Sequence, residues 1–185
     1  MTTRVDDGPK PKDQPPDQPP DQAQDQPKGP LALANRAAIR EISLRLAEQA
    51  RQEILILSRD LDPAYYDRQP FLDAVRRLAL ATPHHPVRVL LFEPRTAVTR
   101  GHRLIALARQ LSSRIGIRRL GADFRDRLDA FLIADGRGYC LRRLADTQEA
   151  VADLDGAREA RLLRAEFQHL WEHSDESIEL RRLHL

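Results

Sequence analysis

The sequence predicts an α/β domain, built on a mixed, mostly parallel sheet with helices on both faces. Short, uninterrupted apolar segments alternate along the chain with longer segments in which apolar residues recur at helical spacing. The short segments lack polar residues at alternate positions, which is typical of strands buried on both faces of a parallel sheet. A glycine-containing hairpin late in the chain adds an antiparallel pair and makes the sheet mixed.

The amino-terminal segment differs from the rest in composition. Of the 13 prolines, most lie in residues 1–30, and residues 13–28 form a four-residue repeat that begins each time with Asp-Gln. Such a segment has little apolar surface to offset the entropy lost on ordering. We therefore expect residues 1–30 to be a disordered tail and residues 31–185 to form one domain.

Helices and strands are expected to alternate from residue 35 to residue 120. Ile39, Ile42 and Leu46 recur at helical spacing with charged residues between them, and Pro70 suits the first turn of the next helix. The expected helices cover residues 35–52, 70–82 and 104–111. The expected strands cover residues 54–57, 87–92 and 115–120.

The last third of the domain is expected to form a hairpin and a long helix. Asp135-Gly136-Arg137-Gly138 suits a tight turn between strands at 130–134 and 139–144. The final helix is expected at 157–174, and imperfect alternation at 178–185 suggests an added edge strand. This helix presents four apolar residues to the core, namely Leu163, Phe167, Leu170 and Trp171.

The expected domain contains no lysine. All three lysines, Lys10, Lys12 and Lys28, lie in the tail. A Walker phosphate loop and a Schiff-base enzyme are excluded, because both need a lysine and arginine does not replace it. The formal net charge of the chain is +2, with arginines interleaved among acidic residues, which is typical of solvated helix faces rather than of a dedicated nucleic-acid stripe.

The remaining motifs indicate no metal and no cofactor. Cys140 lies in an apolar strand and is interpreted as a buried structural residue. His169 and His173 with Glu172 match the spacing of inverted zinc proteases, but that fold is far larger and needs a distant third ligand. Neither an apolar leader nor a run of membrane-spanning length is present, so we expect a cytoplasmic protein without a membrane partner.

The order of elements, with the segment Phe-Leu-Ile-Ala-Asp-Gly that ends at Gly136, resembles one half-domain of the phospholipase D superfamily over residues 35–174. In that family the first hairpin strand carries His-x-Lys before an Asp-Gly pair. Matching that pair to Asp135-Gly136 places Leu128 at the histidine and Ala130 at the lysine. The resemblance therefore implies a degenerate half-domain, similar to uncharacterised bacterial domains that lack the signature.

The resemblance implies that active members use two histidines and a lysine, roles that leucine and alanine cannot perform. Asp135 is interpreted as a turn aspartate that accepts backbone hydrogen bonds, not as a catalytic group. The first hypothesis is therefore a non-catalytic domain that acts as an interaction or regulatory module for an unknown protein partner. Because single-half members of the family dimerise, the resemblance also implies a homodimer.

Two alternatives stay open. One is weak phosphate or nucleic-acid binding through arginines in the former active-site cleft, where a steep loss of affinity with salt is expected. The other is a residual phosphodiesterase that uses a relocated histidine such as His102. The candidate anion-binding residues are Arg59, His102, Arg103, Arg118, Arg142 and Arg143.

Overall fold

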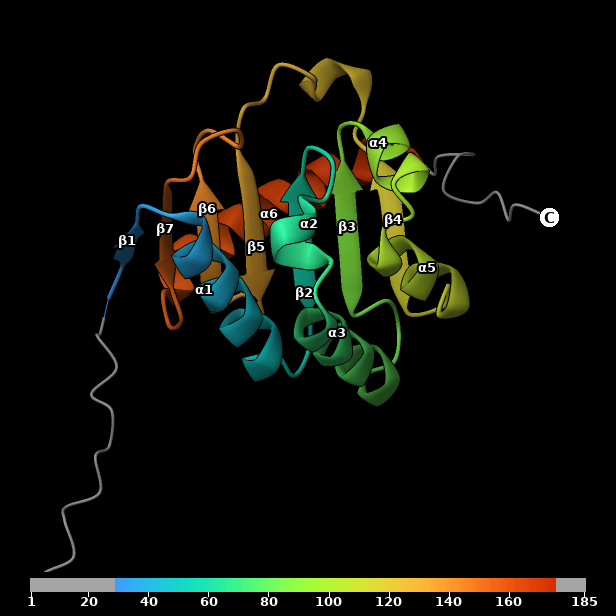
Figure 1. Cartoon of the computed structure of the whole chain (residues 1–185), viewed down its shortest axis with the longest axis horizontal. Helices are drawn as coiled ribbons and strands as arrows, with labels where there is room; N and C mark the ends of the chain where they lie inside the picture. The colour runs from blue at the N-terminus through green and yellow to red at the C-terminus, as the bar shows by residue number, and fades with distance from the viewer. Residues whose placement is uncertain (1–28, 176–185) are drawn as a thin grey trace, which may run out of the picture.

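The computed structural model describes residues 29–175 of the chain. The tail expected at residues 1–30 falls almost wholly outside the described residues, and so does the edge strand expected at 178–185. Within the described range the chain folds as one mixed α/β sheet covered by helices on both faces (Figure 1), as the sequence predicts.

Seven strands form the sheet within the described range, in the order β1-β7-β6-β5-β2-β3-β4. They are β1 (Leu31–Leu33), β2 (Ile54–Ser58), β3 (Val87–Leu91), β4 (Ile115–Arg119), β5 (Ala130–Ala134), β6 (Gly138–Arg142) and β7 (Ala150–Asp153). Strand β3 runs parallel to both β2 and β4. The pairs β2–β5, β5–β6, β6–β7 and β1–β7 are antiparallel.

The expected predominance of parallel pairs is therefore wrong, although the mixed sheet is confirmed. The connections from β2 to β3 and from β3 to β4 cross over through helices, and these two pairs are parallel. In the rest of the sheet, β5 enters antiparallel to β2, and β6 and β7 continue up and down through short connections. Short connections between neighbouring strands allow only antiparallel pairing, because a parallel pair needs a long crossover.

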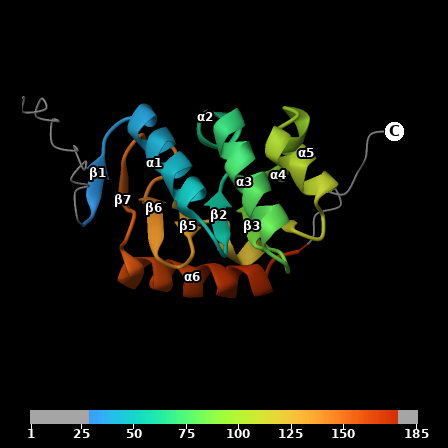
Figure 2. The same cartoon turned by 90° about the horizontal axis from the view of Figure 1, so that it is seen from below.

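The helices cover the two faces unequally, as Figure 2 shows. One face carries α1 (Arg36–Gln49), α2 (Pro63–Tyr66), α3 (Gln69–Ala81), α4 (Pro94–Thr99) and α5 (Arg103–Gln110). The other face carries α6 (Ala157–Glu172). A single 3-10 turn, Ala122–Phe124, lies in the connection from β4 to β5. The four longer helices lie where the sequence predicts them, whereas α2 and α4 were not predicted.

Two apolar clusters hold the layers together, one on each face. The larger joins alternate strand residues such as Ile56 and Leu132 to α1, α2, α3, α4 and α5. We call the face that carries these five helices the crowded face. The smaller joins Leu57 and Phe131 to α6, where Phe167 is fully buried. This alternation follows from the pleat, which sends successive side chains to opposite faces.

Trp171 is only partly buried, contrary to its expected place among the core residues of α6. Its ring stacks on Phe167 with centroids 5.8 Å apart and lies over Gly116, where an added Cβ would come within 3.0 Å of the indole. Trp171 thus covers the outer strand β4 at the end of the helix. The periodicity of α6 gives the correct face, but it cannot show that the sheet ends beneath this residue.

Side chains cap several helices where the sequence changes from extended to helical backbone. Asn35 accepts a hydrogen bond from the Ala38 amide at 2.8 Å, and Asp62 accepts one from the Ala64 amide at 2.9 Å. Such caps satisfy amides that have no partner within the helix. No helix in the described part of the chain is long and apolar enough to cross a membrane.

Candidate functional site

The signature positions that the resemblance assigns lie at two opposite ends of strand β5. Ala130 begins the strand and pairs with Arg142 of β6, whereas Ala134 ends it and pairs with Gly138. We call these the motif end, which holds Leu128, Ala130 and Arg142, and the turn end, which holds Asp135. Five residues of extended strand separate Ala130 from the turn, so the two ends lie about 15 Å apart.

At the motif end, the two positions that the resemblance assigns to histidine and lysine carry no polar side-chain atom. Ala130 is 2% exposed and, two residues before Leu132, points to the same face of the sheet, the one that carries α1 to α5. Leu128 is 56% exposed, and its carbonyl accepts a hydrogen bond from the Ala145 amide at 2.6 Å. Ala130 is thus a packed strand residue and Leu128 an exposed one, and neither side chain can transfer a proton.

Arg142 lies beside Ala130 on the same face, because directly paired residues of antiparallel strands point the same way. Its guanidinium carbon lies 5.1 Å from the centre of the Tyr65 ring. Its Nη2 donates to the carbonyls of Ala145 and Thr147, the latter at 3.0 Å. Arg142 is 8% exposed, and its buried side chain holds the connection after β6 in place through these two hydrogen bonds.

Two buried polar atoms at and beside the Arg142 side chain make no hydrogen bond within the described residues. Neither the Arg142 Nε nor the Tyr65 hydroxyl has a hydrogen-bond partner among the described residues. Burial raises the pKa of the neighbouring Tyr66 hydroxyl well above its ordinary value. Burial also raises the pKa of the Cys140 thiol to about 12, in agreement with its interpretation as a buried structural residue.

The other candidate arginines are mostly engaged by acidic or aromatic groups. Arg103 donates to the carboxylate of Asp67 at 2.6 Å, and Arg59 lies 3.7 Å from the carboxylate of Glu93. Arg118 lies over the Trp171 ring at 4.5 Å and donates to the Trp171 carbonyl at 2.9 Å. Arg103 and Arg118 thus use donors within the fold, whereas Arg59 forms only a long ion pair on the surface.

The structure does not gather the candidate arginines into one cluster. Strand β4, with Arg118, and strand β6, with Arg142, are separated in the sheet by β3, β2 and β5. Arg118 also lies on the α6 face, whereas Arg142 lies on the crowded face. Arg143 is exposed, and its side chain has no partner within residues 29–175.

His102 is a helix cap and is 2% exposed. Its Nδ1 accepts a hydrogen bond from the Leu104 amide at 3.1 Å, at the start of α5. Burial lowers the pKa of His102, and the charge of Asp67 and the backbone of Leu61 oppose this only in part. The Nε2 atom makes no hydrogen bond of good geometry within the described range. The ring is thus held in its neutral form, away from solvent.

At the turn end, Asp135 binds the backbone that leads into β2. Its Oδ2 accepts from the Arg51 amide at 2.8 Å, and its Oδ1 accepts from the amides of Gln52 and Glu53 at 2.8 and 2.9 Å. The β5–β6 connection is the three residues 135–137, in which Asp135 and Gly136 have φ of 55° and 58° and the Arg137 amide donates to the Ala134 carbonyl at 3.0 Å. The carboxylate therefore ties the β5–β6 turn to a segment more than eighty residues away.

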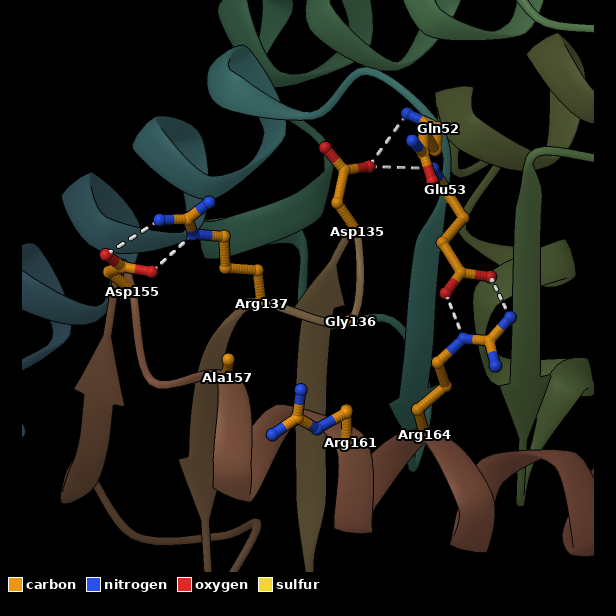
Figure 3. Close-up of a pocket in the computed structure, with 9 residues that line it drawn as sticks. All are labelled: Gln52, Glu53, Asp135, Gly136, Arg137, Asp155, Ala157, Arg161 and Arg164. Atoms are coloured by element: carbon orange, nitrogen blue, oxygen red, sulfur yellow. Dashed lines mark hydrogen bonds and ion pairs between the residues drawn. The ribbon is translucent and has the colours of Figure 1, made fainter.

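Beside Asp135 opens a pocket of about 590 Å³, which Figure 3 shows with its lining residues. Arg137 donates two hydrogen bonds, from its Nε and Nη2 atoms, to the carboxylate of Asp155. Arg164 binds the carboxylate of Glu53 in the same way, and the Nη2 atom of Arg88 lies 3.4 Å from the Glu53 Oε2 atom. The lining residues are Gln52, Glu53, Asp135, Gly136, Arg137, Asp155, Ala157, Arg161 and Arg164.

Sequence reasoning missed this pocket, except for the Asp135-Gly136 turn. Its walls come from the start of β2, the β5–β6 turn, the β7–α6 connection and the first turns of α6. No local motif joins these segments. The one signal in the sequence is the pair Arg161 and Arg164, which lie three residues apart and therefore on neighbouring positions of one helix surface.

Several solved structures share this fold at low sequence identity. Nuc from Salmonella typhimurium, a phospholipase D family member, has a TM-score of 0.55 and 14% identity, covering 80% of this chain and 99% of its own. NucT from Helicobacter pylori has a TM-score of 0.58 and 10% identity over the same shares. The phospholipase D-like fold expected from the sequence is thereby confirmed.

TrmBL2, an archaeal chromatin protein described as showing a novel mode of DNA binding, has a TM-score of 0.60 and 17% identity. The match covers 84% of this chain but only 57% of the TrmBL2 chain. No protein with a curated description matches this sequence. Residues 35–183 match the family model described as "Domain of unknown function (DUF7931)", and the chain therefore belongs to that family.

Proposed function

We propose that this chain is a non-catalytic domain of phospholipase D-like fold that acts as an interaction or regulatory module. The supporting observation is the motif end of β5, where Leu128 and Ala130 occupy the positions that the resemblance assigns to histidine and lysine. A phosphodiesterase of this type needs a nucleophile, a proton donor and a charge that stabilises the phosphorane. Leucine and alanine supply none of the three.

The residues around Ala130 do not replace the missing groups. Arg142 cannot lose its proton, and its Nη2 is already used by two backbone carbonyls. Tyr66 and Cys140 could act as nucleophiles only when deprotonated, and burial raises the pKa of both. His102 is buried and caps a helix. The neighbourhood is therefore suited to packing rather than to phosphoryl transfer.

A hydrolysis assay tests this proposal. The purified chain is incubated with bis(p-nitrophenyl) phosphate, a phospholipid and a short DNA duplex, with and without zinc, and with His102→Asn as a comparison. We expect no turnover above that of a blank purification. Turnover that is lost in His102→Asn, while the thermal midpoint of that variant is unchanged, would show a residual phosphodiesterase and overturn the proposal.

A second candidate function is weak binding of a nucleic-acid backbone at the motif end. Two exposed arginines support it, Arg125 in the β4–β5 connection and Arg143 after β6, because their side chains have no partner in the described part of the chain. TrmBL2, which shares the fold, is described as a DNA-binding protein. Unpaired arginines on one end of a sheet can contact phosphates without reading sequence.

Fluorescence anisotropy with a short DNA duplex tests the second candidate. We expect Arg125→Gln and Arg143→Gln each to weaken binding and to reduce the slope of log K against log salt by about 1 between about 50 and 200 mM salt. Arg40→Gln, an exposed arginine of α1, is the matched control. Equal effects of all three variants, or no binding at about 50 mM salt, would argue against this function.

A further inference from the structure

The pocket at the turn end has the donors of a small-anion site, and it lies at the opposite end of β5 from the motif that the phospholipase D resemblance concerns. We propose that it binds the phosphate group of a small metabolite through Arg137, Arg161 and Arg164. This inference does not depend on the presence or absence of catalysis at the motif end. It assigns a ligand class to a region that the motif does not touch.

Arg137 and Arg164 are each held by a carboxylate, and each keeps an unused hydrogen-bond donor group. Each uses Nε and Nη2 to grip a carboxylate, Asp155 for Arg137 and Glu53 for Arg164. The Nη1 group of each makes no hydrogen bond with any described residue. A guanidinium fixed in this way loses little further freedom when it binds a ligand, so preorganisation favours affinity.

Arg161 supplies the charge. It lines the pocket between Arg137 and Arg164 in Figure 3, and its side chain has no hydrogen bond or ion pair within the described range. It lies on the same helix as Arg164, three residues before it, so two positive charges share one surface of α6. Like charges at this spacing repel each other, and a bound anion removes that cost.

The carboxylates that also line the pocket are each committed to another partner. Asp135 uses both oxygens to accept three backbone amides. The hydrogen bond from Arg137 lowers the pKa of Asp155, which keeps this carboxylate charged and paired. Glu53 lies between Arg164 and Arg88. Among the lining side chains, Arg161 is therefore the charged group left without a partner in the described structure.

The size and shape of the pocket limit the ligand. A volume of about 590 Å³ falls within the range of about 300–1000 Å³ that is typical of small-molecule sites. A tetrahedral phosphate offers oxygens in several directions, which suits arginines that reach the pocket from the β5–β6 turn and from α6. A planar carboxylate can engage fewer of these donors at once.

Calorimetric titration of the full chain with inorganic phosphate, pyrophosphate and AMP tests the proposal. We expect saturable binding of at least one of these probes, weakened about tenfold or more by Arg161→Gln, because a hydrogen bond to a charged group is lost. Arg161→Glu should abolish binding. Arg158→Gln, an exposed arginine of the same helix that does not line the pocket, should leave the affinity unchanged.

Backbone NMR spectra recorded during the same titration locate the ligand. We expect shifts at Gly136 and Ala157, which line the pocket, and none at Arg143 at the motif end. The proposal is overturned if none of the three probes saturates, if Arg158→Gln weakens binding as much as Arg161→Gln, or if the shifts gather at the motif end. Arg161 is exposed, so its variants should keep the thermal midpoint of the parent chain.

Discussion

Asp135 shows at the residue scale how a carboxylate that the resemblance matches to a catalytic signature can hold a turn in place. It lies at the far end of the strand from Ala130, and its two oxygens accept the amides of Arg51, Gln52 and Glu53. The sequence was sufficient to interpret it as a turn residue. The sequence did not show that the amides belong to the start of β2, because that contact joins segments distant along the chain.

Replacing Asp135 should lower stability without affecting any chemistry. Asp135→Ala leaves three amides to find other partners, and we expect a loss of about 1–3 kcal/mol in the free energy of unfolding. Asp135→Asn keeps the oxygen that accepts two of these bonds and tolerates the positive φ, so its loss should be smaller. Urea denaturation of both variants measures the difference. Equal losses would show that the amide bonds are not the cause.

His102 should make stability depend on pH. Burial lowers its pKa in the folded state below the ordinary 6.5, so the unfolded chain binds the proton more tightly. The free energy of unfolding should therefore be highest above about pH 7 and should fall as the pH is lowered through about 6.5 toward the folded pKa.

Urea denaturation between about pH 7.5 and pH 5 measures this dependence. His102→Asn is the informative comparison, because asparagine keeps a side-chain acceptor for the Leu104 amide and has no proton to bind in this range. We expect the variant to show a flatter profile than the parent chain. If both chains lose stability in parallel, another group is responsible.

At the scale of elements, α6 is the one helix of the described chain on its face of the sheet, where it packs against the central strands (Figure 2). Its apolar residues Leu163, Phe167 and Leu170 are buried, as its periodicity predicts. Phe167 meets Phe131 of β5 edge to face, with centroids 6.4 Å apart. Packing of this helix against the sheet therefore shields the smaller apolar cluster from solvent.

Phe167→Ala should cost about 3–5 kcal/mol in the free energy of unfolding, because it leaves a cavity in the smaller cluster. Leu162→Ala, on the exposed side of the same helix, should change stability by less than about 0.5 kcal/mol. Trp171→Ala should lie between the two, since the ring is only partly buried. Chemical denaturation ranks the three. A neutral Phe167→Ala would show that α6 does not cover the sheet as described.

The elements that the sequence predicted share a physical property. Strands β2, β3 and β5 are short apolar runs, and α1, α3, α5 and α6 each carry a repeated apolar face. Strands β1 and β7 were missed, because Leu31–Leu33 and Ala150–Asp153 are brief and contain small or polar residues. The direction of pairing was missed as well, because it depends on partners rather than on local sequence.

At the scale of the whole molecule, self-association stays a prediction. Leu128 and Leu144 are 56% and 47% exposed at the motif end, next to a backbone hydrogen bond between Ala145 and Leu128. Two exposed leucines on neighbouring connections provide apolar surface that a second copy could bury. The resemblance to single-half members of the phospholipase D superfamily also implies a homodimer.

Light scattering should give twice the chain mass of 21.1 kDa. Leu128→Ser combined with Leu144→Ser should shift the mass to that of one chain. Leu80→Ser, which alters a leucine of α3 that is 60% exposed, should leave the mass of the parent chain unchanged. A mass near 21.1 kDa for the parent chain at all concentrations would contradict the prediction.

The three hydrogen bonds that Asp135 accepts separate two roles that the phospholipase D signature pattern combines, namely folding and catalysis. In such a pattern the aspartate is written beside the histidine and the lysine, as though one selective pressure maintained all three. Here the aspartate holds the β5–β6 turn to β2, whatever stands at positions 128 and 130. Folding alone is therefore enough to require an aspartate at position 135, whether or not a chain with this turn transfers phosphoryl groups.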